Sequence, residues 1–303
     1  MSKHIIGVDG GGTKTLAVLF DETGKIIKRH ETGFSNFSID EQTAKLNIIE
    51  AIDEIYNTLD DPKDLMIVIG VAGLAKLRGK ETFKAQVQTR FKADVLLETD
   101  ALIALHSVPN PEHNSVIMAI GGTGSVVMAG EGLEVTMIGG FGHLLGDEGS
   151  AYHFVKNTLK YVIDDFESHQ TASDFSKTIL KKLKIDDYHH LIDFMYNQSK
   201  SEIAQFSKVI VGLEQDGFNE VKTLLEKEAS FAADLIIKGY HKLTNQQNVI
   251  IALRGGFITQ APHVKDTLIE SLNQVIKDYT LDLSNKEPVT GAYYLGSLKK
   301  QMR

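Results

Sequence analysis

An aspartate followed by three glycines and three polar residues stands near the start of the chain, in "IIGVDGGGTKTLAVLF" at residues 5–20. The backbone N–H groups of a glycine-rich turn can hold a phosphate, because glycine allows its close approach. A Walker A loop has Lys directly after the last Gly and leads into a helix. Here Thr13 separates Gly12 from Lys14 and an apolar strand pattern follows. The stretch therefore predicts a β-hairpin that could hold a phosphate, and a tight structural turn is the alternative.

A second glycine stretch, "SVIMAIGGTGSVVMAG" at residues 115–130, repeats this arrangement. In both places an apolar run leads into Gly-Gly, a turn with Thr and Gly follows, and a second apolar run comes next. A strand–turn–strand unit that returns after about 110 residues indicates two similar domains with a cleft between them. The repeat also makes a purely structural role for the first glycine run less favoured.

Regular elements must position these turns. The apolar patterns predict strands at residues 4–10, 14–20, 25–33, 65–73, 94–100 and 248–257. A capping box from Ser38 to Glu41 predicts a helix to about Leu59, with Leu46 and Ile52 on its buried face. Further helices are expected directly after residue 100, at 151–162, over 218–243 and at 290–301, and a linker at 110–114.

Composition limits the classes of function. A chain of 303 residues has the length of about two domains. Its net charge of −8 argues against a nucleic-acid surface, so the attraction of an anion must be local, through amides, a lysine or a metal ion. No apolar run approaches the ~18 residues of a membrane span, and the N-terminus has no signal-peptide pattern. We therefore expect a cytoplasmic protein.

Cysteine is absent from the chain. This excludes disulfides, cysteine nucleophiles, iron–sulfur clusters held by thiolates and thiolate zinc sites. The eleven histidines show no HExxH-like spacing, so no transition-metal site is predicted.

Five motifs in order, "VDGGGTKT", "GFSN", "ETD", "GGTGS" and "GGFGHLLGDEGSAY", give a resemblance over nearly the whole chain. The sequence resembles the N-acetylglucosamine kinase and BadF/BadG/BcrA/BcrD ATPase family, within the actin, sugar kinase and Hsp70 ATPase superfamily. The resemblance implies an α/β fold of two ribonuclease H-like (actin-like ATPase) domains around an interdomain cleft. We expect one domain at 1–112, joined by the helix 288–303, and the other at 113–287.

The resemblance also implies ATP and Mg²⁺ as cofactors. Asp9 matches the family's acid near Mg²⁺, which it would hold through water. The nucleotide-binding positions fall in the two turns and in a late Gly-Gly pair: Gly11, Gly12, Thr13, Lys14, Gly122, Thr123, Gly124, Gly255 and Gly256. Lys14 could instead be a solvated strand residue, and the Gly-Gly pair could simply end a strand.

Asp100, in "ETD", matches the position of the catalytic base, which would accept the proton of a sugar hydroxyl. It could also serve as the N-cap of the helix that follows. Positions that match sugar-binding residues are Asn36, Asp100, Gly140, Phe141 and Asp147. Asn36 could be only a turn residue, and Asp147 could serve the dipole of the next helix. Phe141 stands where relatives often carry Trp, so its contact is the least secure of the set.

The function implied is an ATP-dependent amino-sugar kinase that acts on the 6-hydroxyl of N-acetylglucosamine or a related N-acetylhexosamine, as a homodimer. N-acetylmuramic acid, glucosamine and glucose remain alternatives, with Lys76 or Arg78 as possible contacts of a lactyl carboxylate. A non-catalytic sugar sensor on the same fold is a further alternative. The absence of cysteine argues against the cluster-bearing activators of benzoyl-CoA reductase and against the cysteine-rich zinc motif of ROK sugar kinases. A DNA-binding regulator would need an added domain, and the first strand is expected at residue 4.

Overall fold

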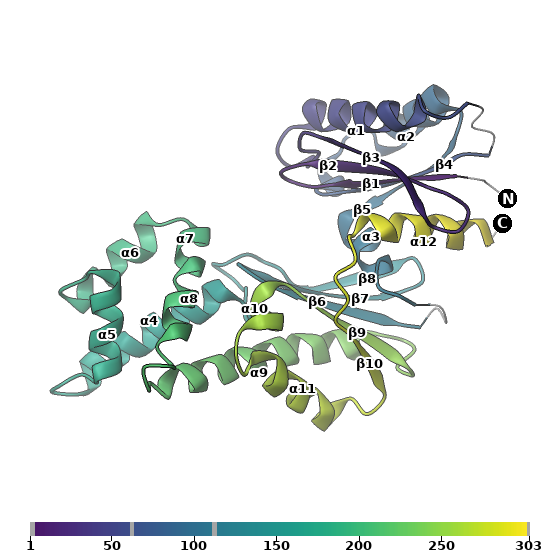
Figure 1. Cartoon of the computed structure of the whole chain (residues 1–303). Coiled ribbons are helices and arrows are strands. Elements are labelled where there is room, and N and C mark those ends of the chain that lie inside the picture. Colours follow the sequence, from purple (N-terminus) through teal and green to yellow (C-terminus); the bar gives the residue numbers. More distant parts are fainter. Residues whose placement is uncertain (1–3, 61–63, 111–113, 302–303) are drawn as a thin grey trace. The chain divides into compact units, whose positions relative to one another are not determined.

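The computed structural model describes residues 4–60, 64–110 and 114–301. The chain divides into two compact units. Unit one comprises Met1–His113, Leu133–Val135 and Ser284–Arg303, and unit two comprises Asn114–Gly132 and Thr136–Leu283. Both are built from β-strands and α-helices (Figure 1).

The sheet of unit one has five strands in the order β3-β2-β1-β4-β5. The strands are β1 (Ile5–Gly10), β2 (Thr15–Phe20), β3 (Ile26–Thr32), β4 (Met66–Val71) and β5 (Asp94–Thr99). β1, β2 and β3 pair as antiparallel neighbours, whereas β4 is parallel to both β1 and β5. The central strands β1, β2 and β4 are buried almost throughout, which explains their continuous apolar runs.

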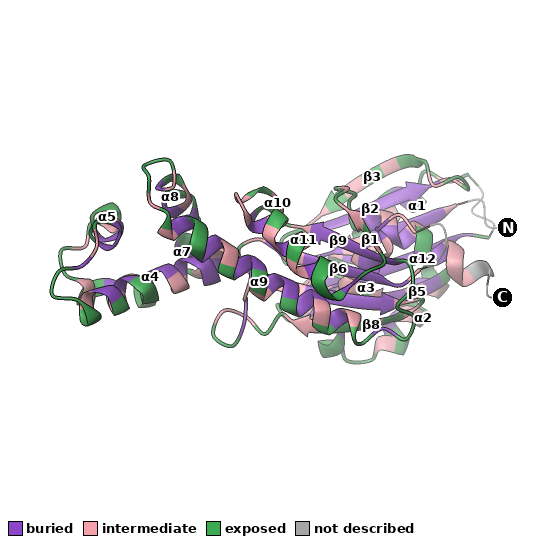
Figure 2. Ribbon diagram, turned by 90° about the horizontal axis from the view of Figure 1, so that it is seen from below, coloured by how far each residue is buried: buried purple, intermediate pink, exposed green. Residues whose placement is uncertain are grey.

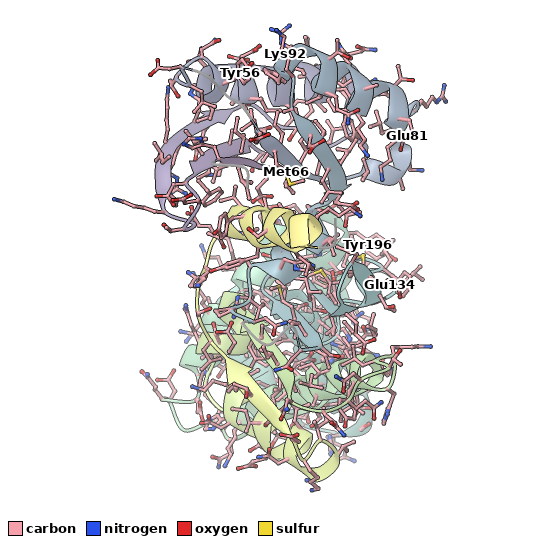
Figure 3. The ribbon with its side chains drawn as sticks, turned by 90° about the vertical axis from the view of Figure 1, so that its right-hand side faces the viewer. Tyr56, Met66, Glu81, Lys92, Glu134 and Tyr196 are labelled. Atoms are coloured by element: carbon pink, nitrogen blue, oxygen red, sulfur yellow. The ribbon has the colours of Figure 1, made fainter. Side chains whose placement is uncertain are left out.

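Helices cover both faces of this sheet (Figure 1). α1 (Glu41–Tyr56) and α2 (Lys80–Phe91) lie on one face, and α3 (Asp100–His106) and α12 (Val289–Gln301) lie on the other. The side chain of Met66 points from β4 toward α12, where it packs with Ala292 and Leu295 (Figure 3). The last helix of the chain is therefore part of the core of unit one.

Unit two repeats the same sheet. Its order is β10-β9-β6-β7-β8, with β6 (Val116–Gly121), β7 (Ser125–Glu131), β8 (Glu134–Gly139), β9 (Val249–Arg254) and β10 (Tyr279–Asp282). β6 pairs antiparallel with β7 and parallel with β9, as β1 does with β2 and β4. The repeat predicted from the two glycine turns is thus present as a repeated strand topology.

Unit two also carries most of the helices. They are α4 (Ala151–Ser168), α5 (Asp174–Leu183), α6 (Leu191–Asn197), α7 (Lys200–Gln205), α8 (Ser207–Gly212), α9 (Glu220–Tyr240), α10 (Gly256–Gln260) and α11 (Val264–Val275). Short 3₁₀ turns occur at Leu74–Lys76 and Tyr188–His190. Buried and exposed residues alternate along α4 and α9, whose apolar faces join one core with β6 and β9 (Figure 2). Among the described residues, no helix combines the length and apolarity needed to cross a membrane.

The start of α1 differs from the prediction. Asp40 is the N-cap, and its carboxylate accepts from the N–H of Thr43, so Ser38 and Glu41 form no capping box. Leu46 was expected on the buried face, but it is 68% exposed, and Ile48 is buried instead. Ile52 is buried as predicted, and Leu46 lies beside the buried stripe, which follows the i, i+4, i+7, i+8 spacing of Ala44, Ile48, Ala51 and Ile52.

Other elements follow the predicted positions with shifted ends, as α9 does at Glu220–Tyr240 against the expected 218–243. The strands β8 and β10 were not predicted. Neither has a buried alternating pattern, because every residue of β8 and of β10 is of intermediate or exposed character. The expected linker at 110–114 falls mainly on residues 111–113, which lie outside the described residues.

Candidate active site

Two acidic residues of unit one, Asp9 and Asp100, lie at one edge of its sheet. Asp9 is the fifth residue of β1, and Asp100 directly follows β5. β1, β4 and β5 run parallel, so their carboxyl ends meet at the same edge. This is where open α/β sheets place ligands.

Backbone hydrogen bonds bring the "GFSN" segment to this edge. The N–H of Ser35 donates to Gly11 O at 2.9 Å, and the N–H of Phe37 donates to Ala72 O at 3.1 Å. Asn36 lies between these two anchors. Its Oδ1 accepts from the N–H of Ser38 at 2.8 Å, so it forms a turn, as the structural alternative expected. Its amide NH₂ has no hydrogen-bond partner among the described residues, and it is free to donate to a ligand.

The two carboxylates of this edge influence each other. Burial, together with the negative charge of Asp100, raises the pKa of Asp9 to about 6, and the positive charge of Lys14 opposes this rise. Burial also raises the pKa of Asp100, against hydrogen bonds from backbone N–H groups. The repulsion between two such partly buried carboxylates decreases when a cation binds or when one of them takes up a proton.

Asp100 is not the N-cap of α3. Thr99 occupies that position, and its hydroxyl accepts from the N–H of Leu102 at 3.2 Å. Asp100 is the first residue of the helix, and its Oδ1 accepts from the N–H of Ala101 at 3.0 Å. The helix therefore has its cap without Asp100, and the other carboxylate oxygen has no hydrogen-bond partner among the described side chains.

The first glycine turn closes through the N–H of Gly11, which donates to Lys14 O at 3.0 Å. The amides of Gly12 and Thr13 have no such partner within the described residues, and both residues are exposed. Lys14 forms an exposed ion pair with Glu31, with Nζ and Oε1 2.6 Å apart. The turn thus offers unpaired amides, whereas Lys14 is already engaged at the surface.

The second turn, Gly122–Gly124, is held from two sides. The N–H groups of Ala151 and Tyr152, at the start of α4, donate to the carbonyls of Gly122 and Thr123 at 2.9 and 3.3 Å. A peptide unit is planar and trans, so its N–H points opposite to its C=O. The amides of Thr123 and Gly124 therefore point away from α4. Neither has a hydrogen-bond partner in the part of the chain that the structure describes.

Asp147 fixes the other side of this turn. It is only 3% exposed, and its Oδ1 accepts from the N–H of Ser125 at 3.0 Å. Its Oδ2 lies 2.6 Å from Nζ of Lys200, in an ion pair without hydrogen-bond geometry. A β-carbon on Gly124 would overlap Nζ of Lys200 and crowd the carboxylate of Asp147, so both side chains would have to shift. Asp147 thus supports the turn, and its sugar contact stays a prediction.

A buried carboxylate also holds the loop that follows Asp147. Glu228 in α9 is fully buried, and its Oε2 accepts from the N–H of Gly149 at 3.0 Å. His153 Nδ1 lies 2.9 Å from the same oxygen, and the amide of Asn157 donates to Oε1 at 2.6 Å. Such a buried charge requires partners on every side. The network ties the loop after Asp147 to α4 and α9.

The late Gly-Gly pair lies beside the second turn. Gly255 has φ of +89°, and a β-carbon there would lie 2.5 Å from the carbonyl oxygen of Gly121. Gly256 begins α10 and has open space around it. Both residues are exposed. The first glycine is therefore required by the fold, whereas the second leaves room for a ligand.

Gly140 and Phe141 lie in the loop after β8. Gly140 has φ of +73°, and the ring of Phe141 is 73% exposed. Leu144 and Leu145, which follow, are also exposed. Phe141 is thus available to a ligand, but no described contact fixes its ring.

Sequence reasoning missed Lys200 and Glu228. Both lie far along the chain from the residues that they contact, and neither belongs to a glycine motif. The capping box of Ser199 and Glu202 would have marked the start of α7, although not what its first residue contacts.

The residues of unit one fit a magnesium ion held mainly by other ligands. No three His, Asp or Glu side chains of residues 4–60, 64–110 and 114–301 cluster as metal ligands. Mg²⁺ keeps several waters and binds through one or two carboxylates plus phosphates. Asp9, with its raised pKa and acidic neighbour, could supply one such carboxylate.

Relatives of known name match the chain over almost its full length. It is 29% identical to the N-acetyl-D-glucosamine kinase of Dictyostelium discoideum, over 99% of this chain and 100% of the relative. It is 28% identical to the N-acetylmuramic acid/N-acetylglucosamine kinase of Clostridium acetobutylicum, over 89% of this chain and 90% of the relative.

A solved structure shows the same fold. It is a ROK family glucokinase from Streptomyces griseus in complex with glucose and AMPPNP, with a TM-score of 0.55 and 17% identity over 98% of this chain and 99% of that one. The prediction of an actin-like α/β fold is thereby confirmed. The family model of the BadF/BadG/BcrA/BcrD ATPases matches residues 6–296. The resemblance predicted from the motifs is confirmed, and the chain belongs to the BadF/BadG/BcrA/BcrD ATPase family.

Proposed function

We propose that this chain is an ATP-dependent kinase that transfers the γ-phosphoryl group of ATP to the 6-hydroxyl of N-acetylglucosamine or a related N-acetylhexosamine. The observation that carries the proposal is the gathering of Asp9, Asn36 and Asp100 at one edge of the sheet of unit one. Both curated relatives described above are named as kinases of amino sugars, which supports the same substrate class.

Asp100 is the general base of this proposal. Its carboxylate accepts the proton of the sugar O6–H while O6 forms a bond to the γ-phosphorus. The bond from the γ-phosphorus to the β–γ bridging oxygen breaks, and ADP leaves. The raised pKa of Asp100 makes it a stronger proton acceptor than an ordinary aspartate.

The two glycine turns bind the phosphates. The unpaired amides of Gly12 and Thr13 in one turn, and of Thr123 and Gly124 in the other, can donate to phosphate oxygens. Gly11, Lys14 and Gly122 are the remaining residues of these two proposed phosphate-binding turns. Gly255 and Gly256 adjoin the second turn, which supports an adenosine site over them.

Asp9 holds Mg²⁺ through water in this proposal. The ion neutralises charge on the phosphates when it is bound. The carboxylate of Asp9 would hold the ion in its ionised form, which predominates in the ligand-free protein above the pKa of about 6.

The sugar is held by groups that donate and accept at its hydroxyls. The free NH₂ of Asn36 supports a hydrogen bond to a ring hydroxyl. Gly140 and the exposed ring of Phe141 would contact an apolar sugar face or the acetyl group. Both carboxylate oxygens of Asp147 already have partners in the protein. Its proposed role as a sugar ligand therefore rests on the family motif alone.

The test is release of ADP with MgATP against N-acetylglucosamine, N-acetylmuramic acid, glucosamine, N-acetylmannosamine and glucose. A kcat/KM for one N-acetylated sugar at least about 100-fold above that for glucose would support the proposal. Product analysis by NMR would identify the phosphorylated hydroxyl. ADP release that does not depend on sugar, or no release with any sugar, would contradict it and favour a sensor.

N-acetylmuramic acid is the second candidate, because one curated relative is named for it. Its lactyl carboxylate requires a cation. Lys76 and Arg78 are exposed and follow Gly73, where a β-carbon would meet Asn36. Substituting both with Ala would reduce activity on N-acetylmuramic acid more than on N-acetylglucosamine if they bind that carboxylate.

We also propose that the enzyme is a homodimer, as the family resemblance implies, and that it acts in the cytoplasm. Light scattering after size-exclusion chromatography would give a mass of twice the chain's 33.4 kDa. A mass equal to one chain would contradict the dimer, and cell fractionation would test the compartment.

A further inference from the structure

Lys200 is the one lysine whose ammonium group the described contacts place at a glycine turn of unit two. Its Nζ lies so close to Gly124 that a β-carbon there would overlap it, and it lies 2.6 Å from Oδ2 of Asp147. The side chain is 32% exposed, whereas that of Asp147 is 3% exposed. One side of the ammonium therefore faces the buried carboxylate, and part of the side chain remains open to solvent.

The fold holds Lys200 in this place. It is the first residue of α7, which begins with a capping box: the Ser199 hydroxyl accepts from the N–H of Glu202, and the Glu202 carboxylate accepts from the N–H of Ser199. Ile203 and Ala204, three and four positions after Lys200 and so on the same face of α7, are buried in the core of unit two together with residues of α4. The position of Nζ is thus set by an anchored helix.

A charge argument gives Lys200 a function. Asp147 holds the second turn through the N–H of Ser125, but it places a negative charge beside amides that are to bind phosphates. The carboxylate of Asp147 and a phosphate bound to these amides would both be negative, and like charges repel strongly where water is excluded. An ammonium group has three N–H donors and no acceptor, so it can neutralise Asp147 and still donate to a second anion.

We propose that Lys200 binds the phosphate chain of the nucleotide directly, next to the amides of Thr123 and Gly124, while it remains paired with Asp147. This inference rests on the proposed function, since it assigns a further residue to the same nucleotide site. Lys14, the lysine of the first turn, is paired with Glu31 instead. The cation of the nucleotide site is therefore supplied by α7, far along the chain from either glycine motif.

The experiment is calorimetric titration of the full chain with adenosine, ADP and ATP in the absence of sugar. Lys200→Met should weaken ATP binding by about 10- to 100-fold, ADP binding less, and adenosine binding not at all. Lys200→Arg should keep most of the affinity. Lys208→Met is the matched control, because Lys208 is an exposed lysine of the neighbouring helix α8, and it should bind ATP like the wild type.

A double variant separates phosphate contact from simple neutralisation of Asp147. In Asp147→Asn/Lys200→Met both charges are removed, and the Asn side chain can still accept from Ser125. Direct contact predicts that the double variant still binds ATP more weakly than the wild type, although removal of the unpaired Asp147 charge restores part of the affinity that Lys200→Met loses. Recovery of wild-type affinity in the double variant would overturn the proposal, as would equal losses for adenosine and ATP or no loss at all.

The same data separate this inference from the proposed function. A wild-type chain that binds no ATP would contradict the kinase itself. A wild type that binds ATP and phosphorylates an amino sugar, with a Lys200→Met variant that binds ATP equally well, would contradict only the role of Lys200.

Discussion

The carboxylate of Glu228 accepts a hydrogen bond from the backbone N–H of Gly149 at 3.0 Å, across 79 positions of sequence. Glu228 is fully buried, and Gly149 has φ of +78° and packs against Ala232, one turn further along α9. A negative charge in the core is thus used to hold a backbone turn. The turn carries Asp147, two residues earlier, which in turn holds Ser125.

Glu228→Ala should lower the free energy of unfolding by about 3–5 kcal/mol, because it leaves the Gly149 amide and the polar groups of His153 and Asn157 without their shared acceptor. Glu228→Gln keeps an acceptor and should cost clearly less. Urea denaturation at pH 7 measures both. Equal losses in the two variants would show that the negative charge, which both variants lack, and not the presence of one acceptor, matters at this position.

Asp9 should make the stability of the ligand-free protein depend on pH. Its pKa is about 6 in the folded protein, against an ordinary 3.8, so the folded state binds the proton more tightly. Stability must then fall as pH rises from about 4 to 6, by at most ~3 kcal/mol from this group. Asp9→Asn should therefore be more stable than the wild type at pH 7.5 and lose this advantage near pH 4. Urea denaturation without Mg²⁺ or nucleotide checks it.

Asp21 offers a control of opposite sign. A hydrogen bond from the Thr23 hydroxyl lowers its pKa, so its ionised form adds stability above its unfolded pKa, which is lost as pH falls. Asp21→Asn should be less stable than the wild type at pH 7.5, and the two should converge in acid. A difference between Asp9→Asn and wild type that does not change with pH would contradict the assigned pKa.

The hairpin that opens each unit could be predicted from local patterns. Each glycine turn is flanked by apolar runs, and a hairpin is short-range, so its residues are neighbours in sequence. The sequence predicts the last helix and its return to the first domain. Its packing on β1 and α3 is a long-range contact made by the buried side chains of Ala292 and Leu295. Exposed strands such as β8 carry no such pattern, which is why they were missed.

The side chains that support the site could not be predicted in the same way. Asp147 and Lys200 are 53 positions apart, and the ion pair between them depends on how α7 packs against unit two. The cap of α1 shows the same limit on a small scale. Ser38 and Asp40 were both chemically able to cap, and the backbone of Asp40, with φ of −153°, decides between them.

Asp100→Asn should keep sugar binding and lose most turnover. Asn has nearly the same size but cannot accept the proton of the sugar hydroxyl, so kcat should fall by about 10²–10⁴-fold. Calorimetry with the sugar alone should give an affinity close to that of the wild type. Stability at pH 7 should not fall, because Thr99 caps α3 without help from Asp100 and burial, which raises the pKa of Asp100, disfavours its ionised form. Unchanged turnover would remove Asp100 from the mechanism.

The pair Gly255 and Gly256 separates the needs of the fold from those of the nucleotide. Gly255→Ala places a β-carbon 2.5 Å from the Gly121 carbonyl oxygen at φ of +89°, so it should destabilise the protein by more than ~2 kcal/mol. Gly256→Ala has only the Gln260 side chain within 4 Å, at 3.9 Å, and begins a helix, so stability should hold or rise by about 0.4–1 kcal/mol.

Gly256→Ala should weaken nucleotide binding, although it leaves the stability of the protein unchanged or raises it. If adenosine lies against this glycine, the added methyl group weakens ATP and adenosine binding equally, because it acts on the part that both share. That pattern differs from the loss expected at Lys200, which grows with the number of phosphates. Calorimetric titration of Gly256→Ala with both ligands decides the question: unchanged affinity for both would place the adenosine away from Gly256 and leave Gly255 as a residue of the fold alone.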